Sequence, residues 1–439
     1  MVHGLCGMVS LMKIVDWVKN NVYNLDCRIG LDNLPDECID TFISSPPYYS
    51  VRDYDIDPII WDEDPNCEHE WIDSVDHKYS GGISDSYGLG QFSSDKTHFV
   101  STSKTCIKCG AWLGDLGLEP SPDLFIKHLC DIYDKIKRVL KPTGTVWINL
   151  GDTYSGGKSQ RTGKDTNFES ETFGGWKNWD CIRKTVKTTH EIPRKCMMMI
   201  PERFAIEMID RGWILRSKVI WHKPNAMPDS AKDRFPVDYE IIYFFVKSDK
   251  YFFDREAIRE EISQSEASLN RRKYKPGKNE GRYSEAKEFS MSTAKDQYWS
   301  DGRYKRSVWS INTKQSPAEH YAAYPEDLVE PMILAGCPER ICKICEKPLY
   351  PIYEDKNHSK IFIGYEKCCG NEDDWKPGIV CDPFSGIGTT MRTAISLERD
   401  YIGFELSKQY TNYAVQFNKE RVEKICAEKH KGQGDFLML

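Results

Sequence analysis

The feature that most constrains the fold of this chain is a glycine-rich turn between a short apolar segment and a helix. Residues Gly378–Cys381 have the pattern of a buried strand, Asp382–Thr390 reads DPFSGIGTT, and Met391–Glu398 has helical spacing. In an α/β sheet such a turn lies at the carboxyl end of a strand, where backbone N–H groups can bind an anionic or nucleotide ligand. The segment therefore predicts a nucleotide-type site in a mainly parallel sheet.

The details of this turn narrow the choice of ligand. Phe384–Thr389 reads FSGIGT, which is not the GxGxxG of dinucleotide-binding folds, and no GK[ST] follows it. Both observations disfavour NAD and ATP. The next predicted strand, Tyr401–Phe404, ends at Glu405. An acid at this position can bind two ribose hydroxyls, which supports a nucleoside-containing ligand.

A segment near the N-terminus has the order strand, helix, strand. The apolar run Ile39–Ser44 ends in Ser45–Tyr48, which reads SPPY, and two adjacent prolines stop a strand. Pro122–Leu140 has its apolar residues on one helical face, and Lys141–Gly144 ends this helix. Thr145–Leu150 follows as a buried strand. This order indicates a βαβ unit and a mainly parallel sheet.

The middle of the chain predicts an antiparallel element. Pro201–Gly212 is amphipathic and predicts a helix, and Trp213–Trp221 predicts the strand after it. Tyr239–Val246 and Tyr251–Phe253 flank the polar residues Lys247–Lys250, which predicts an antiparallel hairpin. Two further helices are expected nearer the C-terminus, at Pro325–Gly336 and Ser407–Ala427.

Composition excludes several classes of protein. The 439 residues are 40% hydrophobic and carry a net charge of −7, so the chain can bury a sizeable core and is not a generic polycation. No apolar run approaches the roughly 20 residues that span a bilayer. Lys13 and Asp16 interrupt the apolar patch at the N-terminus, which argues against a signal peptide. We expect a cytoplasmic or nuclear protein with no membrane partner.

Two polar segments nevertheless carry a basic excess. Residues 155–196 contain nine basic and five acidic residues, and residues 271–306 contain eleven basic and five acidic residues with interleaved aromatics. Either segment is explained by a solvated loop. An acidic protein with two basic insertions favours the other explanation, in which these segments contact phosphates and bases.

The two loops resemble the motifs of one enzyme family. Asp382–Thr389 resembles the S-adenosylmethionine motif of DNA amino-methyltransferases, and Ser45–Tyr48 resembles their catalytic motif. The catalytic motif comes first, as in the permuted β group of that family. Gly114–Pro120, Asn149–Tyr154 and Trp221–Asn225 extend the resemblance to bacterial and phage site-specific enzymes, over nearly the whole chain.

This resemblance implies an α/β fold with a Rossmann-like, seven-stranded methyltransferase sheet that carries an antiparallel hairpin. The expected cofactor is S-adenosylmethionine, and the expected partner is double-stranded DNA, which would place the protein at the nucleoid. A cognate restriction endonuclease, as a separate chain, would make the protein half of a restriction-modification pair. The residues expected to contact the cofactor are Asp382, Pro383, Phe384, Ser385, Gly386, Gly388, Thr389, Glu405, Tyr324 and Pro325.

The residues expected to be catalytic are Ser45, Pro46, Pro47 and Tyr48, and their chemistry suits the role. An exocyclic amino group is a poor nucleophile because its lone pair is delocalised into the base. The Ser45 side chain and the Pro46 carbonyl can accept its N–H hydrogens, and Tyr48 offers a π face to a flipped-out base. Family usage assigns Ser-Pro-Pro-Tyr mostly to N4-cytosine enzymes, so Ser45 favours cytosine N4.

Alternatives remain at this stage. Adenine N6 is the runner-up because the same fold carries both chemistries. Methylation at cytosine C5 is disfavoured, because it needs a Pro-Cys nucleophile and none of the 22 prolines precedes a cysteine. A non-catalytic, zinc-stapled DNA-binding protein is the rival from another class, and an RNA or protein-glutamine substrate is a weaker one.

Sixteen cysteines in a chain without a secretion signal point to metal ligands rather than disulfides. Eight metal-ligand residues are predicted in two sets, namely Cys67, His69, Cys106 and Cys109, and Cys342, Cys345, Cys368 and Cys369. Each set can bind a structural zinc ion, with Cys337 as a substitute in the second. Buried free thiols are the alternative for both sets.

These observations divide the chain into five segments with two insertions. The expected segments are a catalytic half at 12–154 with a zinc-binding insertion at about 62–112, a variable DNA-contacting insertion at 155–200, further methyltransferase sheet at 201–256, a basic aromatic target-recognition segment at 257–310, and a cofactor-binding half at 311–439 with a cysteine-rich insertion at about 337–376.

Overall fold

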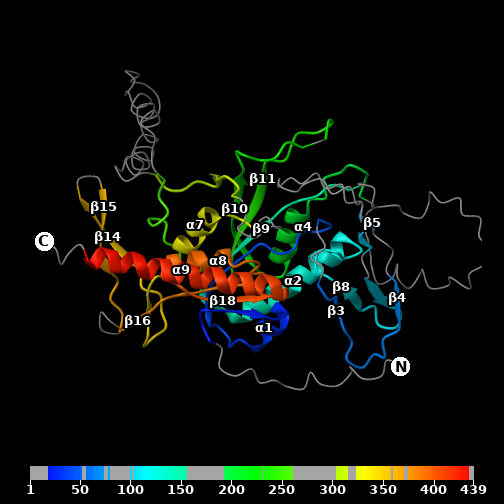
Figure 1. Cartoon of the computed structure of the whole chain (residues 1–439), viewed down its shortest axis with the longest axis horizontal. Coiled ribbons are helices and arrows are strands. Elements are labelled where there is room, and N and C mark those ends of the chain that lie inside the picture. The colour runs from blue at the N-terminus through cyan, green and yellow to red at the C-terminus, as the bar shows by residue number, and fades with distance from the viewer. Residues whose placement is uncertain are drawn as a thin grey trace, which may run out of the picture.

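The protein is built around one large mixed sheet (Figure 1). The computed structural model describes residues 18–51, 56–73, 78–79, 99–100, 103–155, 192–229, 231–260, 303–314, 323–356, 359–369 and 374–434. Most of the two basic segments lies outside these residues. Within the described part, the main sheet has the strand order β1 (Asn21–Asn24), β18 (Asp400–Glu405), β17 (Ile379–Asp382), β2 (Ile39–Ser44), β9 (Leu140–Leu150), β11 (Tyr239–Val246), β10 (Ile214–His222) and β12 (Val308–Ser310).

The described sheet has eight strands, one more than predicted, because the short strand β12 pairs in parallel with β10. The predicted parallel part is confirmed, since β1, β18, β17, β2 and β9 pair in parallel along the sheet. β11 alone runs antiparallel to both of its neighbours, β9 and β10. The result is the α/β, Rossmann-like arrangement that the sequence predicts.

The predicted hairpin between Tyr239–Val246 and Tyr251–Phe253 is wrong. The antiparallel partner of β11 is β10, and β9 occupies its other edge, so no edge is left for a strand at Tyr251–Phe253. Two of these residues instead pack on the sheet face against Phe244, with ring centroids 5.7 Å away for Tyr251 and 5.5 Å away for Phe253. The aromatic residues of Tyr251–Phe253 therefore pack against the sheet and do not form a strand in it.

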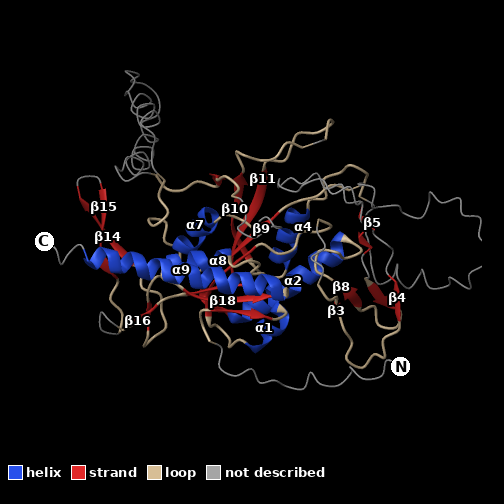
Figure 2. Ribbon diagram, in the orientation of Figure 1, coloured by secondary structure: helices blue, strands red, loops and turns tan. Residues whose placement is uncertain are grey.

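Helices cover both faces of the sheet, as Figure 2 shows. One buried cluster joins the sheet to α1 (Cys27–Asn33), α2 (Pro122–Val139) and α4 (Ile200–Asp210), and the other joins it to α7 (Glu326–Gly336), α8 (Thr389–Ser396) and α9 (Lys408–Gly434). Strand β11 supplies both layers by alternation. Ile241, Tyr243 and Phe245 belong to the first cluster, and Ile242, Phe244 and Val246 belong to the second.

The predicted helices are confirmed with small changes at their ends. α2 begins where the sequence indicates, because Ser121 Oγ accepts a hydrogen bond from the N–H of Leu124 and Pro122 occupies the first turn. The following strand is longer than predicted. β9 begins at Leu140 and includes Pro142, a residue that usually stops a strand.

Two small β insertions project from this core. The first contains the sheet β3 (Ile59–Trp61), β8 (Trp112–Gly114), β7 (Lys104–Cys106) and β4 (Trp71–Asp73), with the nearby pair β5 (Lys78–Tyr79) and β6 (Phe99–Val100). The second pairs β13 (Ile341–Cys342) with β16 (Trp375–Lys376), and β14 (Pro351–Lys356) with β15 (Ser359–Tyr365). Among the described helices, none combines the length and apolar character that a bilayer crossing requires.

Candidate active site

The glycine turn and the Ser-Pro-Pro-Tyr loop lie side by side at the carboxyl ends of two neighbouring strands. Strands β2 and β17 are neighbours and run parallel, with Val380 opposite Thr41 and Cys381 opposite Phe42. The loop after β2 begins at Ser45 and the glycine turn begins after Asp382, so both leave the sheet at the same edge. In parallel α/β sheets, ligands bind at this carboxyl edge.

The glycine turn is held by short hydrogen bonds around its leading acid. The N–H of Phe384 donates to Asp382 Oδ1 at 2.9 Å, and Ser385 Oγ donates to the Asp382 carbonyl at 3.0 Å. Gly388 has a φ of 82°, and a Cβ there would lie 2.9 Å from the Cβ of Ala414 in α9. A side chain is therefore excluded at Gly388 by both conformation and packing.

Tyr324 is joined to this turn through Asp382. Its hydroxyl donates to Asp382 Oδ2 at 3.0 Å, and Thr390 Oγ1 donates to the same oxygen at 2.6 Å. Burial raises the pKa of Asp382 to about 6, although these donors and the Phe384 N–H oppose the rise. Pro325, the residue before α7, is buried next to Tyr324.

Glu405 closes the other side of the turn. Its carboxylate accepts hydrogen bonds from the N–H groups of Gly386 and Ser407, both at 2.8 Å. Burial raises the pKa of Glu405 to about 7, and the nearby Asp382 carboxyl acts in the same direction. A Cβ built on Gly386 would meet no atom within 4 Å, so the space beside the turn is open to a ligand.

The Ser-Pro-Pro-Tyr loop is packed against the backbone of two neighbouring segments. Ser45 Oγ donates to the hydroxyl of Tyr48 at 3.3 Å, and the N–H of Ser50 donates to the Gly117 carbonyl at 2.7 Å. The Tyr48 ring lies against Gly151, where a Cβ would come within 2.6 Å of Cε2. The loop is therefore supported by residues from two of the segments that carried the family resemblance.

A buried polar network behind Tyr48 was not predicted. The Tyr48 hydroxyl donates to Glu240 Oε2 at 2.8 Å, and Asn149 Nδ2 donates to the same hydroxyl at 2.8 Å and to Glu240 Oε2 at 2.7 Å. Lys223 Nζ forms an ion pair with Glu240 Oε1. One sequence signal was available, because Glu240 is the charged residue within an otherwise apolar strand.

Asp152 belongs to the Asn149–Tyr154 segment of the family resemblance, and in the structure it supports the start of a helix. Its carboxylate accepts hydrogen bonds from the N–H groups of Thr153, Met199 and Ile200, at 2.8, 2.9 and 3.1 Å. The last of these residues begins α4, so Asp152 satisfies N–H groups at a helix start.

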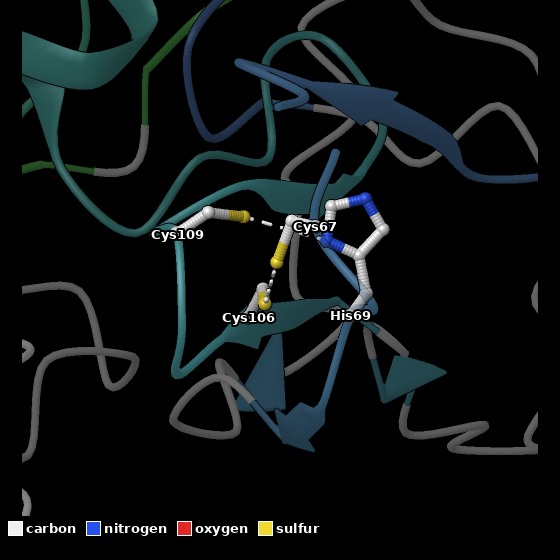
Figure 3. A group of neighbouring side chains, drawn as sticks. All are labelled: Cys67, His69, Cys106 and Cys109. Carbon is white, nitrogen blue, oxygen red and sulfur yellow. Dashed lines mark hydrogen bonds between the residues drawn. The ribbon is translucent and has the colours of Figure 1, made fainter. Parts of the chain in front are cut away.

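The first cysteine set converges on one point, as Figure 3 shows. The four ligand atoms of Cys67, His69, Cys106 and Cys109 all lie within 4.8 Å of one another. Cys67 Sγ is 3.9 Å from Cys106 Sγ, and Cys109 Sγ is 3.4 Å from His69 Nδ1. Three sulfurs and one imidazole nitrogen at this spacing form a donor set suited to tetrahedral zinc.

The second cysteine set also comes together. The sulfurs of Cys342, Cys345, Cys368 and Cys369 lie within 4.8 Å of one another, although the last two residues are exposed. Cys337 does not join them, because it lies fully buried at the end of α7, within the second hydrophobic cluster. The substitution of Cys337 for one ligand, which the sequence left open, is therefore wrong for this arrangement.

The first insertion is attached to the core beside the Ser-Pro-Pro-Tyr loop. Trp61 and Trp112 stack on the ring of His128 in α2, with centroids 4.6 and 5.7 Å away. His128 Nδ1 lies 3.0 Å from Glu119 Oε1, and Glu119 Oε2 accepts a hydrogen bond from the N–H of Gly117 at 2.8 Å. Gly117 in turn contacts the loop, so the insertion and the loop share one support.

Several known proteins are similar in sequence to this chain. Residues 39–416 match a family model described as DNA methylase, the N6/N4 family. The chain belongs to the N6/N4 DNA methylase family. The Type II methyltransferase M.Cfr9I of Citrobacter freundii is 30% identical over 301 residues, which cover 68% of this chain and 73% of that protein. M.SmaI of Serratia marcescens is 25% identical over 398 residues, covering 90% and 88%.

Two solved structures are similar to this DNA methylase. The PvuII DNA methyltransferase, titled cytosine-N4-specific, is 13% identical with a TM-score of 0.44, and the match covers 92% of this chain and 91% of that one. A putative DNA modification methylase from Thermus thermophilus, complexed with S-adenosyl-L-methionine, is 14% identical with a TM-score of 0.41, covering 92% and 95%.

The contact between Tyr48 and Gly151 gives a test of this site. We expect Gly151→Ala to lower the kcat for DNA methylation by about a hundredfold, because the new methyl group displaces the Tyr48 ring. Steady-state kinetics measure the effect. Gly336→Ala is the matched control. Its Cβ would lie 2.4 Å from Thr145 Oγ1, in a part of the sheet that does not contact Tyr48, so this substitution should lower the stability of the protein rather than kcat. Equal kcat values for Gly151→Ala and wild type would contradict the assigned packing.

Proposed function

We propose that this DNA methylase transfers a methyl group from S-adenosylmethionine to the exocyclic N4 of a cytosine in a specific sequence of duplex DNA. The observation that carries the proposal is the parallel pairing of β2 with β17. This pairing brings the glycine turn and the Ser-Pro-Pro-Tyr loop, more than 300 residues apart in sequence, to the same edge of the sheet. The proposed cofactor site and the proposed site for the target amino group are therefore adjacent.

The residues around the glycine turn fit the proposed cofactor. The Glu405 carboxylate lies at the end of β18, the strand next to β17. There it would accept hydrogen bonds from the hydroxyls of a ribose. The backbone from Asp382 to Gly388 and the Tyr324 hydroxyl would surround the rest of the molecule. S-adenosylmethionine, when bound, supplies an electrophilic methyl group. The chain's own task is to hold the target amino group next to it.

The Ser-Pro-Pro-Tyr loop would perform that task. Ser45 Oγ and the Pro46 carbonyl would accept the two N–H hydrogens of the target amino group and draw its nitrogen toward sp³ geometry. The Tyr48 ring would stack on the base after it leaves the duplex. A strong general base is unnecessary, because the amine loses its proton only after it gains the methyl group.

The choice of cytosine N4 rests on Ser45. Adenine N6 is the second candidate, because the matched family includes both chemistries in its name. The proposed partners are duplex DNA and a cognate restriction endonuclease on a separate chain, and the proposed site of action is the nucleoid in the cytoplasm. Residues 155–200 and 257–310, largely outside the described part, are proposed to contact the DNA.

We propose in addition that each cysteine set binds one structural zinc ion. The first set offers three sulfurs and an imidazole nitrogen, and the second offers four sulfurs. Four protein ligands leave no open position for chemistry, so the ions would stabilise the two small insertions, which have few buried apolar residues of their own. The first ion would also stabilise the support shared with the Ser-Pro-Pro-Tyr loop.

The substrate atom can be tested directly. We expect purified protein, S-adenosylmethionine and unmethylated duplex DNA of mixed sequence to yield N4-methylcytosine after digestion and mass spectrometry. N6-methyladenine would replace the proposed base while keeping the reaction. Absence of any modified nucleoside, with cofactor binding intact, would contradict the proposal. A Tyr48→Ala variant that methylates as well as wild type would contradict the assignment of the loop.

The raised pKa of Glu405 predicts pH-dependent cofactor binding. Only the ionised carboxylate can accept both ribose hydroxyls, and with a pKa of about 7 it is mostly protonated at low pH. Affinity for S-adenosylmethionine should therefore rise by about tenfold or more between roughly pH 5.5 and pH 8. Calorimetric titration measures it. Glu405→Gln should bind weakly with a much flatter profile, and a wild-type affinity independent of pH would contradict this role.

The zinc proposal is tested by metal content. Protein purified without chelators should contain about two zinc ions per chain by elemental mass spectrometry. Cys109→Ser and Cys345→Ser should each lose about one ion, because each removes a ligand from a different set. Cys426→Ser is the control, since this exposed cysteine belongs to neither set. Wild-type protein without bound zinc, or equal zinc contents in all three variants, would overturn the proposal.

A further inference from the structure

Tyr48 belongs to a buried network whose members lie in, or just after, four neighbouring strands. Tyr48 follows β2, Asn149 lies in β9, Glu240 lies in β11 and Lys223 follows β10, and these strands are consecutive in the sheet. Asn149, Glu240 and Lys223 are 4%, 8% and 6% exposed. Three buried polar side chains thus converge behind the one partly exposed member.

The network fixes both the donor and the acceptor side of the Tyr48 hydroxyl. The hydroxyl donates a hydrogen bond to Glu240 Oε2 at 2.8 Å. It also accepts a hydrogen bond from Asn149 Nδ2 at 2.8 Å. Asn149 uses its other hydrogen on Glu240 Oε2 at 2.7 Å. These bonds hold the end of the tyrosine ring from two sides, while Gly151 supports the ring itself.

Glu240 is the centre of this arrangement and remains ionised. Burial alone would raise its pKa, but the ammonium of Lys223, the Tyr48 hydroxyl and the Asn149 amide together lower it. An ionised acceptor forms shorter and stronger hydrogen bonds than a neutral one. The Lys223–Glu240 ion pair therefore strengthens the bond that restrains Tyr48.

We propose that Glu240 is a positioning residue that acts through Tyr48, and that Lys223 maintains its charge. The network would orient the tyrosine ring before DNA arrives, so that a flipped base meets a fixed aromatic face. This inference rests on the proposed function of the Ser-Pro-Pro-Tyr loop. It adds a requirement that the loop sequence does not contain, because the restraint comes from β9, β11 and the end of β10.

The rival explanation is that the ion pair only stabilises the sheet. A matched control exists at the opposite end of the same sheet. Lys141 Nζ lies 2.9 Å from Asp40 Oδ1, and the two residues are 8% and 3% exposed. Asp40 is near the beginning of β2, whereas Tyr48 follows its end. Asp40→Asn combined with Lys141→Gln removes a comparable buried pair away from Tyr48.

A double-mutant cycle separates the two explanations. Single-turnover and steady-state kinetics on duplex DNA are measured for wild type, Tyr48→Phe, Glu240→Gln and the double variant. In a parallel binding assay, the fluorescence of 2-aminopurine placed next to the target cytosine reports whether that cytosine has left the stack. We expect each single variant to lose about tenfold to a hundredfold in kcat, with the KM for S-adenosylmethionine little changed. The double variant should be no slower than the slower single one, because both remove the same restraint.

The fluorescence is a readout that a purely structural role would not move. The two single variants should show the same smaller increase in 2-aminopurine fluorescence on binding, because the target base leaves the stack less often. The Asp40→Asn/Lys141→Gln control should give the wild-type fluorescence increase and kcat. Multiplicative losses in the double variant, or a normal fluorescence signal in Glu240→Gln, would overturn the proposal.

Glu240→Gln leaves the Lys223 ammonium buried without its carboxylate, which destabilises a protein strongly. A variant with Glu240→Gln and Lys223→Met removes that buried charge and is measured in parallel. It should fold and keep the kinetic loss, whereas recovery of wild-type kcat would contradict the role of Glu240. If wild-type protein methylates no DNA at all, the proposed function fails, which is distinct from an active wild type with multiplicative losses.

Discussion

The parallel pairing of β2 with β17 is the constraint on which the rest of the site depends. The pairing aligns Thr41 and Phe42 with Val380 and Cys381, so both strands end at the same edge. A shift of one residue would exchange the two faces of a strand and move its buried side chains into the wrong layer. Thr41 also donates its hydroxyl to the Gly336 carbonyl at 2.6 Å, which ties the end of α7 to the same strand.

Around this pair, the alternation of side chains along the strands buries both faces of the sheet. Alternate residues of each central strand enter one or the other hydrophobic cluster, so the middle of the sheet is covered on both faces. The polar exceptions occur near strand ends. Asn149 and Glu240 lie close to the carboxyl edge of the sheet, where the loop after β2 supplies Tyr48 as their partner. These two buried polar groups thus lie where they can hold a functional side chain.

The insertions are connected to this centre by aromatic stacking rather than by strand pairing with the main sheet. Trp61 and Trp112 both stack on His128, and Glu119 links that histidine to the backbone of Gly117 beside the loop. The second insertion contacts the core through Tyr350, whose ring centroid lies 5.0 Å from that of Phe252. Each insertion therefore combines a cysteine set with aromatic contacts, and neither interrupts the strand order of the core.

Local pattern by itself determined much of this protein. The glycine turn, the Pro-Pro loop and the helix starts depend on residues close in sequence, and the structure contains each of them within a residue or two of the predicted position. Each CxxC pair is also local, but the approach of Cys67 to Cys106, 39 residues away, depends on the tertiary structure. Pairing of distant segments was decided only by tertiary structure. The sequence could not show that both edges of β11 are occupied, that Cys337 is buried in the core, or that Glu240 meets Tyr48 across 192 residues. Such contacts depend on which strands become neighbours, and that order is set by packing of the whole sheet rather than by any local preference.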